Sequence, residues 1–394
     1  MAPISANSTP RFFAGVMTGT SLDAIDVAIL GIHANNATRQ TQSGMTLNHF
    51  LSKPLDTALI DAMLSLQVQD EDELHRAALI ANTFADAISR TVLEALSLSG
   101  LKSKDIVAIG VHGQTIRHQP RLGYTIQLNA PARIAEATGI TVVSDFRSRD
   151  IAAGGQGAPL VPAFHRAIFQ HDPEVRVLVN VGGIANITWL GRTTLGYDTG
   201  PGNILMDAWI RAHRGEPFDA NGQWAATGIV HKGLLNAMLG DPFFSIEPPK
   251  STGRDLFSMA WLQALLSQSA FHAISAQDVQ ATLLALTAKS IAKEIHRIEN
   301  RPGLFDKEIC TKLLVCGGGA KNLHLMGSLT SELEKILARK VVVSSTADEG
   351  WNPQAIEASA FAWLAWRTLD GKPGNVPSVT GAIGERILGS ITPA

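Results

Sequence analysis

The stretch that decides the fold is RFFAGVMTGTSLDAIDVAIL, residues 11–30. An apolar run at residues 12–17 leads into the turn Thr18-Gly19-Thr20-Ser21, and an alternating run follows at residues 26–30. Alternation of apolar and polar residues is typical of a half-buried strand, so these two runs predict a hairpin around a glycine turn. The backbone N–H groups of such a turn can also hold phosphate oxygens.

The same pattern returns about half a chain later. A strand is predicted at residues 175–181, followed by the turn Gly182-Gly183 and a return strand at residues 186–190. A third version joins an apolar run at residues 313–316 to Gly317-Gly318-Gly319 and a helix at residues 322–337. The repetition predicts two similar α/β halves.

Between these repeats, residues 72–98 carry apolar positions at the spacing of an amphipathic helix, and residues 106–111 read as a strand. A chain of 394 residues has the length of two domains. We predict an α/β fold with an N-terminal domain at residues 1–143, on which a tail at about 379–394 packs back, and a C-terminal domain at residues 144–378. The glycine- and proline-rich residues 152–162 are the expected crossing.

The composition limits the classes of function. Hydrophobic residues make up 45% and charged residues 17% of the chain, and the net charge is −2. These values are typical of a globular protein and predict no nucleic-acid partner. No apolar run approaches the roughly 20 residues of a membrane span, and the N-terminus does not resemble a signal peptide. We therefore expect a cytoplasmic protein without a membrane partner, in which Cys310 and Cys316 are small buried hydrophobes.

The first glycine turn offers more than backbone donors. Thr20 and Ser21 add hydroxyl groups, and Asp23 offers a carboxylate to a hydrated magnesium ion. A glycine in a hairpin can equally serve steric needs alone, but three recurrences favour a nucleotide site. The chain contains neither a G-x-x-x-x-G-K-[ST] loop nor a G-x-G-x-x-G fingerprint, so P-loop and Rossmann schemes do not fit.

Four polar residues are candidates for chemistry at a sugar. Asp198 ends a predicted strand and could be a general base, although it could instead cap the helix that starts near Ile204. His112 and Gln114 directly follow a strand, which is the usual place for binding residues in open α/β sheets, although a lone histidine is more often structural. Glu357, among alanines and phenylalanines, needs a partner such as a substrate hydroxyl or a neighbouring side chain.

Taken together, several segments resemble the anhydro-N-acetylmuramic acid kinase family, which belongs to the superfamily of acetate and sugar kinases, heat-shock chaperones and actin. The resemblance covers nearly the whole chain after the first ten residues. The segments that carry it are GTSLDAID at 19–26, HGQT at 112–115, DFR at 145–147 with Asp150, GGQGAPL at 154–160, NVGGIAN at 180–186, DTGPGN at 198–203, KSTGR at 250–254 and Glu357 within AIEASAFAWLA.

This resemblance implies two ribonuclease-H-like domains, as in actin-like ATPases, around an interdomain cleft. It implies a homodimer that uses ATP and Mg²⁺, with Asp198 as the catalytic base and Asp23 as the metal ligand. The residues that would contact the sugar are His112, Gln114, Arg147, Gly200 and Glu357. Those that would contact ATP are Gly19, Thr20, Ser21, Leu22, Asp23, Ala24, Ile25, Asp26, Gly182, Gly183, Asn186, Gly317, Gly318 and Gly319.

The implied reaction opens the 1,6-anhydro bridge of 1,6-anhydro-N-acetylmuramic acid with water and phosphorylates the 6-oxygen, giving N-acetylmuramic acid 6-phosphate in peptidoglycan recycling. Two departures stand out: Ala24 replaces the glycine usual in the family, and Met17 replaces the aspartate that other sugar kinases carry before the Gly-Thr pair. A kinase of another anhydro sugar such as levoglucosan, and an ATP-driven binding protein like actin or a chaperone, remain as alternatives.

Overall fold

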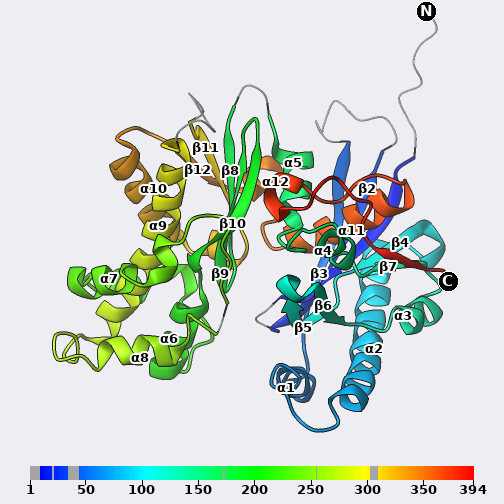
Figure 1. Cartoon of the computed structure of the whole chain (residues 1–394), viewed down its shortest axis with the longest axis horizontal. Helices are drawn as coiled ribbons and strands as arrows, with labels where there is room; N and C mark the ends of the chain where they lie inside the picture. The colour runs from blue at the N-terminus through cyan, green and yellow to red at the C-terminus, as the bar shows by residue number, and fades with distance from the viewer. Residues whose placement is uncertain (1–8, 20–21, 34–43, 172–173, 254, 302–308) are drawn as a thin grey trace, which may run out of the picture. The chain divides into compact units, whose positions relative to one another are not determined.

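The computed structural model describes residues 9–394 except 20–21, 34–43, 172–173, 254 and 302–308. The chain folds as two compact units, residues 1–168 with 355–394, and residues 169–354. Figure 1 labels most of their helices and strands. The predicted boundaries at 143/144 and 378/379 both lie inside the first unit, because residues 144–168 and 355–378 make their contacts there.

The first unit is built on a six-stranded sheet in the order β13-β7-β4-β1-β2-β3. Its strands are β1 (Arg11–Met17), β2 (Ala24–Ile32), β3 (Met45–Pro54), β4 (Ile106–Val111), β7 (Val142–Ser144) and β13 (Ser390–Thr392), with a separate hairpin of β5 (Gln114–Gln119) and β6 (Tyr124–Leu128). Its helices are α1 (Thr57–Ser65), α2 (Glu73–Ser99), α3 (Pro131–Thr138), α4 (Ser148–Ala152), α5 (Val161–Phe169), α11 (Ile356–Leu369) and α12 (Pro377–Thr380).

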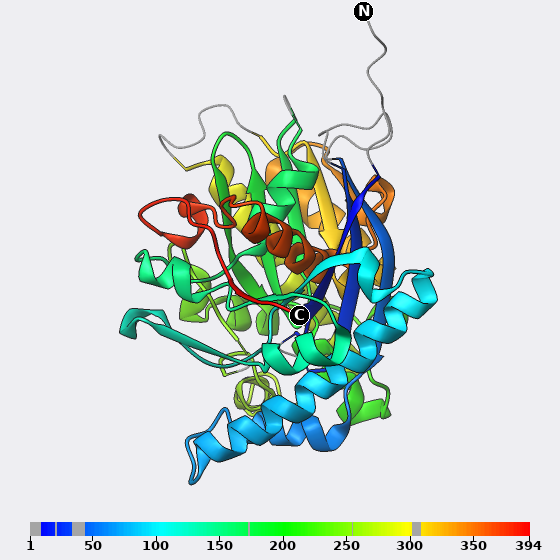
Figure 2. The ribbon, with the colours of Figure 1, turned by 90° about the vertical axis from the view of Figure 1, so that its right-hand side faces the viewer.

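Two helices cover opposite faces of this sheet. Ala14 and Val16 of β1 belong to the same core cluster as the buried face of α2. Gly15, between them, faces α11, where a side chain at that position would overlap the carbonyl oxygen of Ala358. Successive strand residues point to opposite faces, so the two contacts fall on different sides. Figure 2 shows the long helix α2 and the helix α11 flanking the blue strands of the sheet.

The second unit repeats this topology. Its five-stranded sheet has the order β10-β9-β8-β11-β12. The strands are β8 (Arg176–Val181), β9 (Ile184–Leu190), β10 (Thr194–Pro201), β11 (Lys312–Cys316) and β12 (Val342–Ser345), and the helices are α6 (Ile204–Arg214), α7 (Lys232–Leu239), α8 (Met259–Leu266), α9 (Ala276–Glu299) and α10 (Leu323–Leu337).

In both units an antiparallel meander of three strands continues into parallel strands. In the first, β1 pairs antiparallel with β2 and parallel with β4. In the second, β8 pairs antiparallel with β9 and parallel with β11. This shared order is that of a ribonuclease-H-like fold, so the predicted α/β class with two such domains is confirmed. The predicted helix at 72–98 and strand at 106–111 correspond to α2 and β4.

Candidate active site

A polar cluster of the first unit surrounds Arg147, which lies just after β7. Its Nη1 donates a hydrogen bond to the carbonyl oxygen of Gly157 at 2.7 Å. Its Nη2 and Nε donate to Nε2 of His112 at 2.7 and 3.2 Å. Because Nε2 accepts these bonds, the neutral ring of His112 carries its proton on Nδ1.

Burial decides the charge state of this pair. It lowers the pKa of Arg147 to about 10, against the opposing influence of the Glu357 and Asp150 carboxylates. Burial, together with the neighbouring Arg147 cation, also lowers the pKa of His112 well below its usual value. At neutral pH the cluster therefore holds one cation, the guanidinium, beside a neutral imidazole. The partner expected for Glu357 is supplied in part by this cation.

Several buried polar atoms near this cluster make no hydrogen bond within the described residues. They lie after β1, after β4, on or just after the β5–β6 hairpin, and on α11. The ring of His112 contacts the ring of Phe361 on α11, with ring centroids 4.8 Å apart. The atoms are Thr18 Oγ1, His112 Nδ1, Gln114 Oε1, Asn129 Oδ1 and Ser359 Oγ. Buried polar groups are normally paired, so these donors and acceptors suit a ligand rich in hydroxyl groups.

The predicted phosphate loop of the first unit is only partly a surface feature. Leu22 and Ile25 are core residues with 0% and 2% of their surface exposed. Ala24 opens β2, and Asp26 on the same strand is opposite Met17 of β1. Gly19 accepts a hydrogen bond from the backbone of Leu22 at 3.1 Å, which closes the turn. Only backbone groups of Leu22 and Ile25 could therefore serve a phosphate.

Two members of this loop, Thr20 and Ser21, lie outside the described residues. Asp23 is exposed at the start of β2. Its negative charge helps to raise the pKa of Asp26, although burial of Asp26 is the larger cause and a hydrogen bond from Ser52 opposes both. Two carboxylates close enough to repel each other are a suitable pair for a divalent cation.

In the second unit Asp198 lies near the carboxyl end of β10, beside a bulge. Its Oδ2 accepts hydrogen bonds from the backbone N–H of Thr252 at 2.9 Å and from the hydroxyl of Ser251 at 3.0 Å. The N-cap position of α6 is occupied by Asn203. Asp198 therefore does not cap that helix, which removes the structural alternative considered for it.

Burial raises the pKa of Asp198, and the bonds from Thr252 and Ser251, together with the charge of Lys250, lower it in part. A carboxylate with a raised pKa is a stronger base, so it accepts a proton more readily than an exposed aspartate. The strand register aligns Asp198 with Asn186 on β9 and Asn186 with Asn180 on β8. Directly opposite residues share a face of the sheet, so the three polar side chains form one row.

The glycine segments of the second unit converge beside this row. The backbone N–H of Gly202 donates to the carbonyl oxygen of Gly183 at 2.9 Å. A side chain at Gly202 would overlap the carbonyl oxygen of Gly182, and one at Gly319 would overlap Val181. Gly317 has a left-handed backbone with φ of 76°. These glycines are required by the fold itself.

Three other glycines are not required by packing. A Cβ atom at Gly182 or Gly183 would have its nearest neighbour 3.7 or 3.8 Å away, and one at Gly318 would have it 3.6 Å away. Glycine at these positions leaves the backbone N–H groups open to a close ligand. Gly200 differs, because its φ of 144° and the ring of Phe244, 2.8 Å from a Cβ there, explain glycine sterically.

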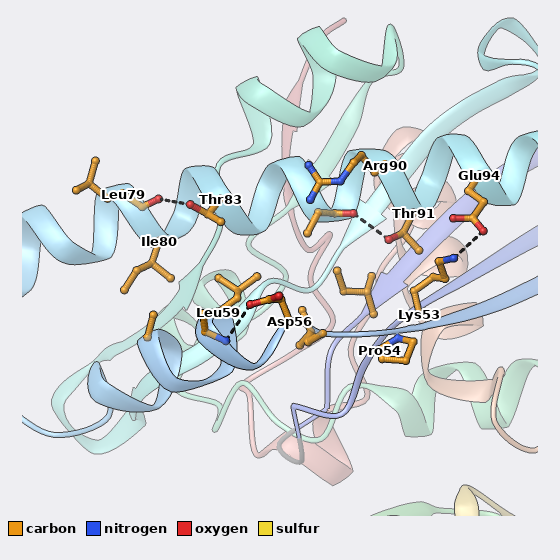
Figure 3. Close-up of a pocket in the computed structure, with 15 residues that line it drawn as sticks. Lys53, Pro54, Asp56, Leu59, Leu79, Ile80, Thr83, Arg90, Thr91 and Glu94 are labelled. Atoms are coloured by element: carbon orange, nitrogen blue, oxygen red, sulfur yellow. Dashed lines mark hydrogen bonds and ion pairs between the residues drawn. The ribbon is translucent and has the colours of Figure 1, made fainter.

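A separate hollow of about 660 Å³ lies between α1, α2 and the end of β3. Figure 3 shows Leu59, Leu79 and Ile80 on its walls, with the ion pair of Lys53 and Glu94 at one end. The lining includes Ile25 but neither His112 nor Arg147. It is therefore distinct from the Arg147 cluster.

Sequence reasoning did not assign a role to Thr18, Asn129, Ser359, Ser251 or Thr252. Thr18 and Asn129 follow strands, and that position alone could have suggested them. No local signal marks Ser359, because it lies two positions from Glu357 on α11 and so does not share its face of the helix. Ser251 and Thr252 approach Asp198 only through the tertiary structure.

Two α/β units with a shared strand order, a buried carboxylate and open glycines after strands suit a phosphotransferase. The chain belongs to the anhydro-N-acetylmuramic acid kinase family, whose model matches residues 11–394. Among the described residues, no helix has the length and apolarity needed to cross a membrane.

Curated relatives agree with this placement. The anhydro-N-acetylmuramic acid kinase of Bordetella petrii is 48% identical over 98% of both chains. That of Pseudomonas fluorescens is 45% identical, over 97% of this chain and 99% of its own. An activator of 2-hydroxyisocaproyl-CoA dehydratase from Clostridium difficile, solved with bound ADPNP, has a TM-score of 0.44 at 12% identity, covering 91% of this chain and 96% of its own.

Proposed function

We propose that this protein is an ATP-dependent kinase that opens the 1,6-anhydro bridge of 1,6-anhydro-N-acetylmuramic acid and phosphorylates the 6-oxygen. The product is N-acetylmuramic acid 6-phosphate, an intermediate in peptidoglycan recycling. The observation that carries the proposal is the buried carboxylate of Asp198, with its two donors and raised pKa, in a chain of this family.

The substrate explains why a lone base is sufficient. The 6-oxygen of an anhydro sugar carries no proton, because it is bonded to the anomeric carbon. Asp198 therefore takes a proton from water, and this water attacks the anomeric carbon as its bond to the 6-oxygen breaks. The departing 6-oxygen captures the γ-phosphoryl group of ATP, and ADP leaves. Glycosidases use two carboxylates for their two proton transfers, whereas here phosphoryl transfer replaces protonation of the leaving oxygen.

In the second unit, backbone N–H groups at the open glycines Gly182, Gly183 and Gly318 would hold phosphate oxygens of ATP. In the first unit, the loop around Gly19 is the proposed phosphate-binding segment. Asp23 is the proposed ligand of a hydrated Mg²⁺, with Asp26 as its negatively charged neighbour. Magnesium commonly keeps several waters and takes one or two carboxylates along with substrate phosphates. When bound, it would offset the negative charge of the phosphoryl oxygens.

The sugar would be recognised by the Arg147 cluster. Its guanidinium suits a carboxylate, which 1,6-anhydro-N-acetylmuramic acid carries on its lactyl group. The unpartnered polar atoms of His112 and Gln114 suit hydroxyl and amide groups, and Glu357 can accept from a hydroxyl. We also propose a cytoplasmic homodimer, for which light scattering of the purified protein is the test.

A coupled assay of ADP release tests the proposed substrate. With ATP and magnesium, we expect release with 1,6-anhydro-N-acetylmuramic acid and much less with levoglucosan, which lacks the lactyl and acetamido groups. Equal or greater release with levoglucosan would assign the chain to that substrate instead. ADP release that needs no sugar at all would favour an ATP-driven binding protein.

Isotopically heavy water tests the coupled chemistry. The label should enter the anomeric hydroxyl and be absent from the oxygen that joins carbon to phosphorus. Short reaction times limit exchange at the reducing end. Label in the phosphate bridge, or ring opening without ATP, would contradict the mechanism.

A further inference from the structure

A buried ion pair lies beneath the Asp198 site, in the second unit. Nζ of Lys250 is 2.7 Å from Oε1 of Glu294 on α9, and the side chains are only 1% and 5% exposed. Lys250 also donates to the carbonyl oxygen of Phe243 at 3.4 Å and lies over the ring of that residue. Charges so deeply buried are costly, and well-packed apolar residues often replace them without loss of stability. A role other than stability is therefore expected.

Glu294 connects the two segments that hold the carboxylate of Asp198. One of its oxygens, Oε2, accepts a hydrogen bond from the hydroxyl of Tyr197 at 3.1 Å. Tyr197 is the residue before Asp198 on β10. The other oxygen, Oε1, binds Lys250, the residue before the two that donate to Asp198. One carboxylate thus joins the strand of the base to the segment of its donors.

The backbone completes this connection. The N–H of Asp198 donates to the carbonyl oxygen of Lys250 at 3.2 Å. Ser251 and Thr252 then reach Oδ2 of the same aspartate. A shift of Lys250 would therefore move the donors and the aspartate relative to each other, because all of these contacts share a few consecutive residues.

We propose that Glu294, Lys250 and Tyr197 form a positioning clamp that holds Ser251 and Thr252 against the carboxylate of Asp198 and thereby sets the orientation and basicity of this group. The three residues touch neither ATP nor sugar in this role; they act through Asp198. The role of Asp198 as base rests on the proposed function, whereas the clamp concerns the carboxylate itself.

The charged neighbours predict the direction of the effect. Lys250 is the cation that acts on Asp198 among the described residues and lowers its pKa, as do the Ser251 and Thr252 bonds. Nη1 of Arg297 lies 3.5 Å from Oε1 of Glu294. The charges of Arg297 and Arg301 oppose the rise in the pKa of Tyr197 that burial causes. Weakening the clamp removes donors from the charged carboxylate, so the pKa of Asp198 should rise further.

The test is the pKa of Asp198, measured by ¹³C NMR on protein labelled at the aspartate carboxyl carbons. Loss of one signal in Asp198→Asn assigns the resonance. The double variant Lys250→Met with Glu294→Gln removes both charges, so that neither is left buried alone. We expect its Asp198 pKa to rise by about one unit or more, through the lost charge of Lys250 together with weakened hydrogen bonds from Ser251 and Thr252. Tyr197→Phe keeps the Lys250 charge and loses only a bond to Glu294, so a smaller rise in this variant reports the clamp itself.

A matched control exists on the same helix. Glu299 of α9 pairs with Arg339, and also accepts from the backbone N–H of Cys310 at 2.7 Å. Arg339→Met with Glu299→Gln removes a less buried ion pair at the end of α9, past Glu294, whose residues make no hydrogen bond to Tyr197, Asp198 or Lys250 among the described residues. It should leave the pKa of Asp198 unchanged, even if it lowers the melting temperature as much as the clamp variant does.

An unchanged Asp198 pKa in Tyr197→Phe would overturn the clamp, even if the pKa rises in the double variant, because the double variant also removes the Lys250 charge that acts directly on Asp198. The pH profile of kcat then tests the base separately. If the clamp holds, the acid limb of kcat should move to higher pH with the NMR value. A shifted pKa with an unshifted kcat profile would support the clamp and count against Asp198 as the base.

Discussion

The two units share one strand order but use their glycines differently. In the first unit Gly15 and Gly110 lie inside strands, where side chains would overlap the backbone of Ala358 and Phe361 on α11. In the second unit Gly182, Gly183 and Gly318 follow strands, and a Cβ atom there would meet its neighbours only at ordinary contact distance. Glycine therefore brings a helix close to the sheet in one unit and leaves a backbone open to a ligand in the other.

The polar residues of the two units also differ. The first unit gathers a cation, Arg147, and neutral groups such as His112 with buried atoms that lack partners. In the second unit the carboxylate of Asp198 already accepts hydrogen bonds from Ser251 and Thr252 of the same unit. The groups of the Arg147 cluster thus suit ligand recognition, whereas the carboxylate of Asp198 suits proton transfer.

The largest effect is expected at Asp198. Asp198→Asn keeps the shape but cannot take a proton, so turnover should fall by about 10²–10⁴-fold. ATP affinity should change little, because the base acts on water. Steady-state kinetics with calorimetric titration of ATP measures both. Turnover within a few-fold of the wild type would show that the base lies elsewhere and would break this contrast between the units.

Gly183 tests the open glycines of the second unit. ATP at a hundredfold excess over Kd should stabilise the wild type by about 2.7 kcal/mol. Gly183→Val should fold, since the nearest atom to a Cβ there is 3.8 Å away, yet it should lose the ATP-dependent rise in Tm. Gly327→Val is the control, because a Cβ at this position of α10 would meet no atom within 4 Å. This variant should keep the ATP-dependent rise in Tm.

Gly202→Ala is the opposite case, because glycine at this position is required by packing. A side chain there overlaps the backbone of Gly182, so Tm should fall with or without ATP. A full ATP-dependent rise in Tm in Gly183→Val would show that Gly183 does not bind the nucleotide.

Arg147 tests recognition in the first unit. Lysine lacks the planar fork that reaches both His112 and Gly157, so Arg147→Lys should raise KM for the sugar roughly ten- to hundredfold. ATP affinity should stay unchanged. Arg133→Lys, in an exposed ion pair with Asp86, is the control and should have little effect. A KM unchanged in Arg147→Lys would separate the sugar site from this cluster.

The smallest effect concerns stability against pH. Burial lowers the pKa of His165, on α5 of the first unit, to about 3. The unfolded chain binds a proton here below about pH 6.5 while the folded chain stays neutral, so stability is lost as pH falls, by at most about 1.4 kcal/mol per pH unit. His165→Gln should reduce the slope of unfolding free energy between pH 6 and about 4, as seen in urea titrations. The exposed His272→Gln should leave the slope as it is.

The amino-acid sequence by itself determined the repeated architecture. Alternation and glycine turns have a local physical cause, which is why the hairpin of β1 and β2 and its counterpart β8 and β9 could be predicted. The same local logic found β4 and α2 nearly to the residue. Asp198, His112 and Arg147 were predicted from their positions at strand ends and from motifs of the family.

Tertiary structure decided what local patterns cannot encode. The unit boundary at 354/355 depends on contacts of α11, which returns to the first unit from a late part of the chain. Leu22 and Ile25 sit in a loop-like motif, yet they pack into the core because β2 pairs directly with β1. The donors on Asp198 come from Ser251 and Thr252, more than fifty positions away, and Glu294 is further still. Packing between distant segments brings such partners together, and a local sequence pattern cannot predict which residues will meet.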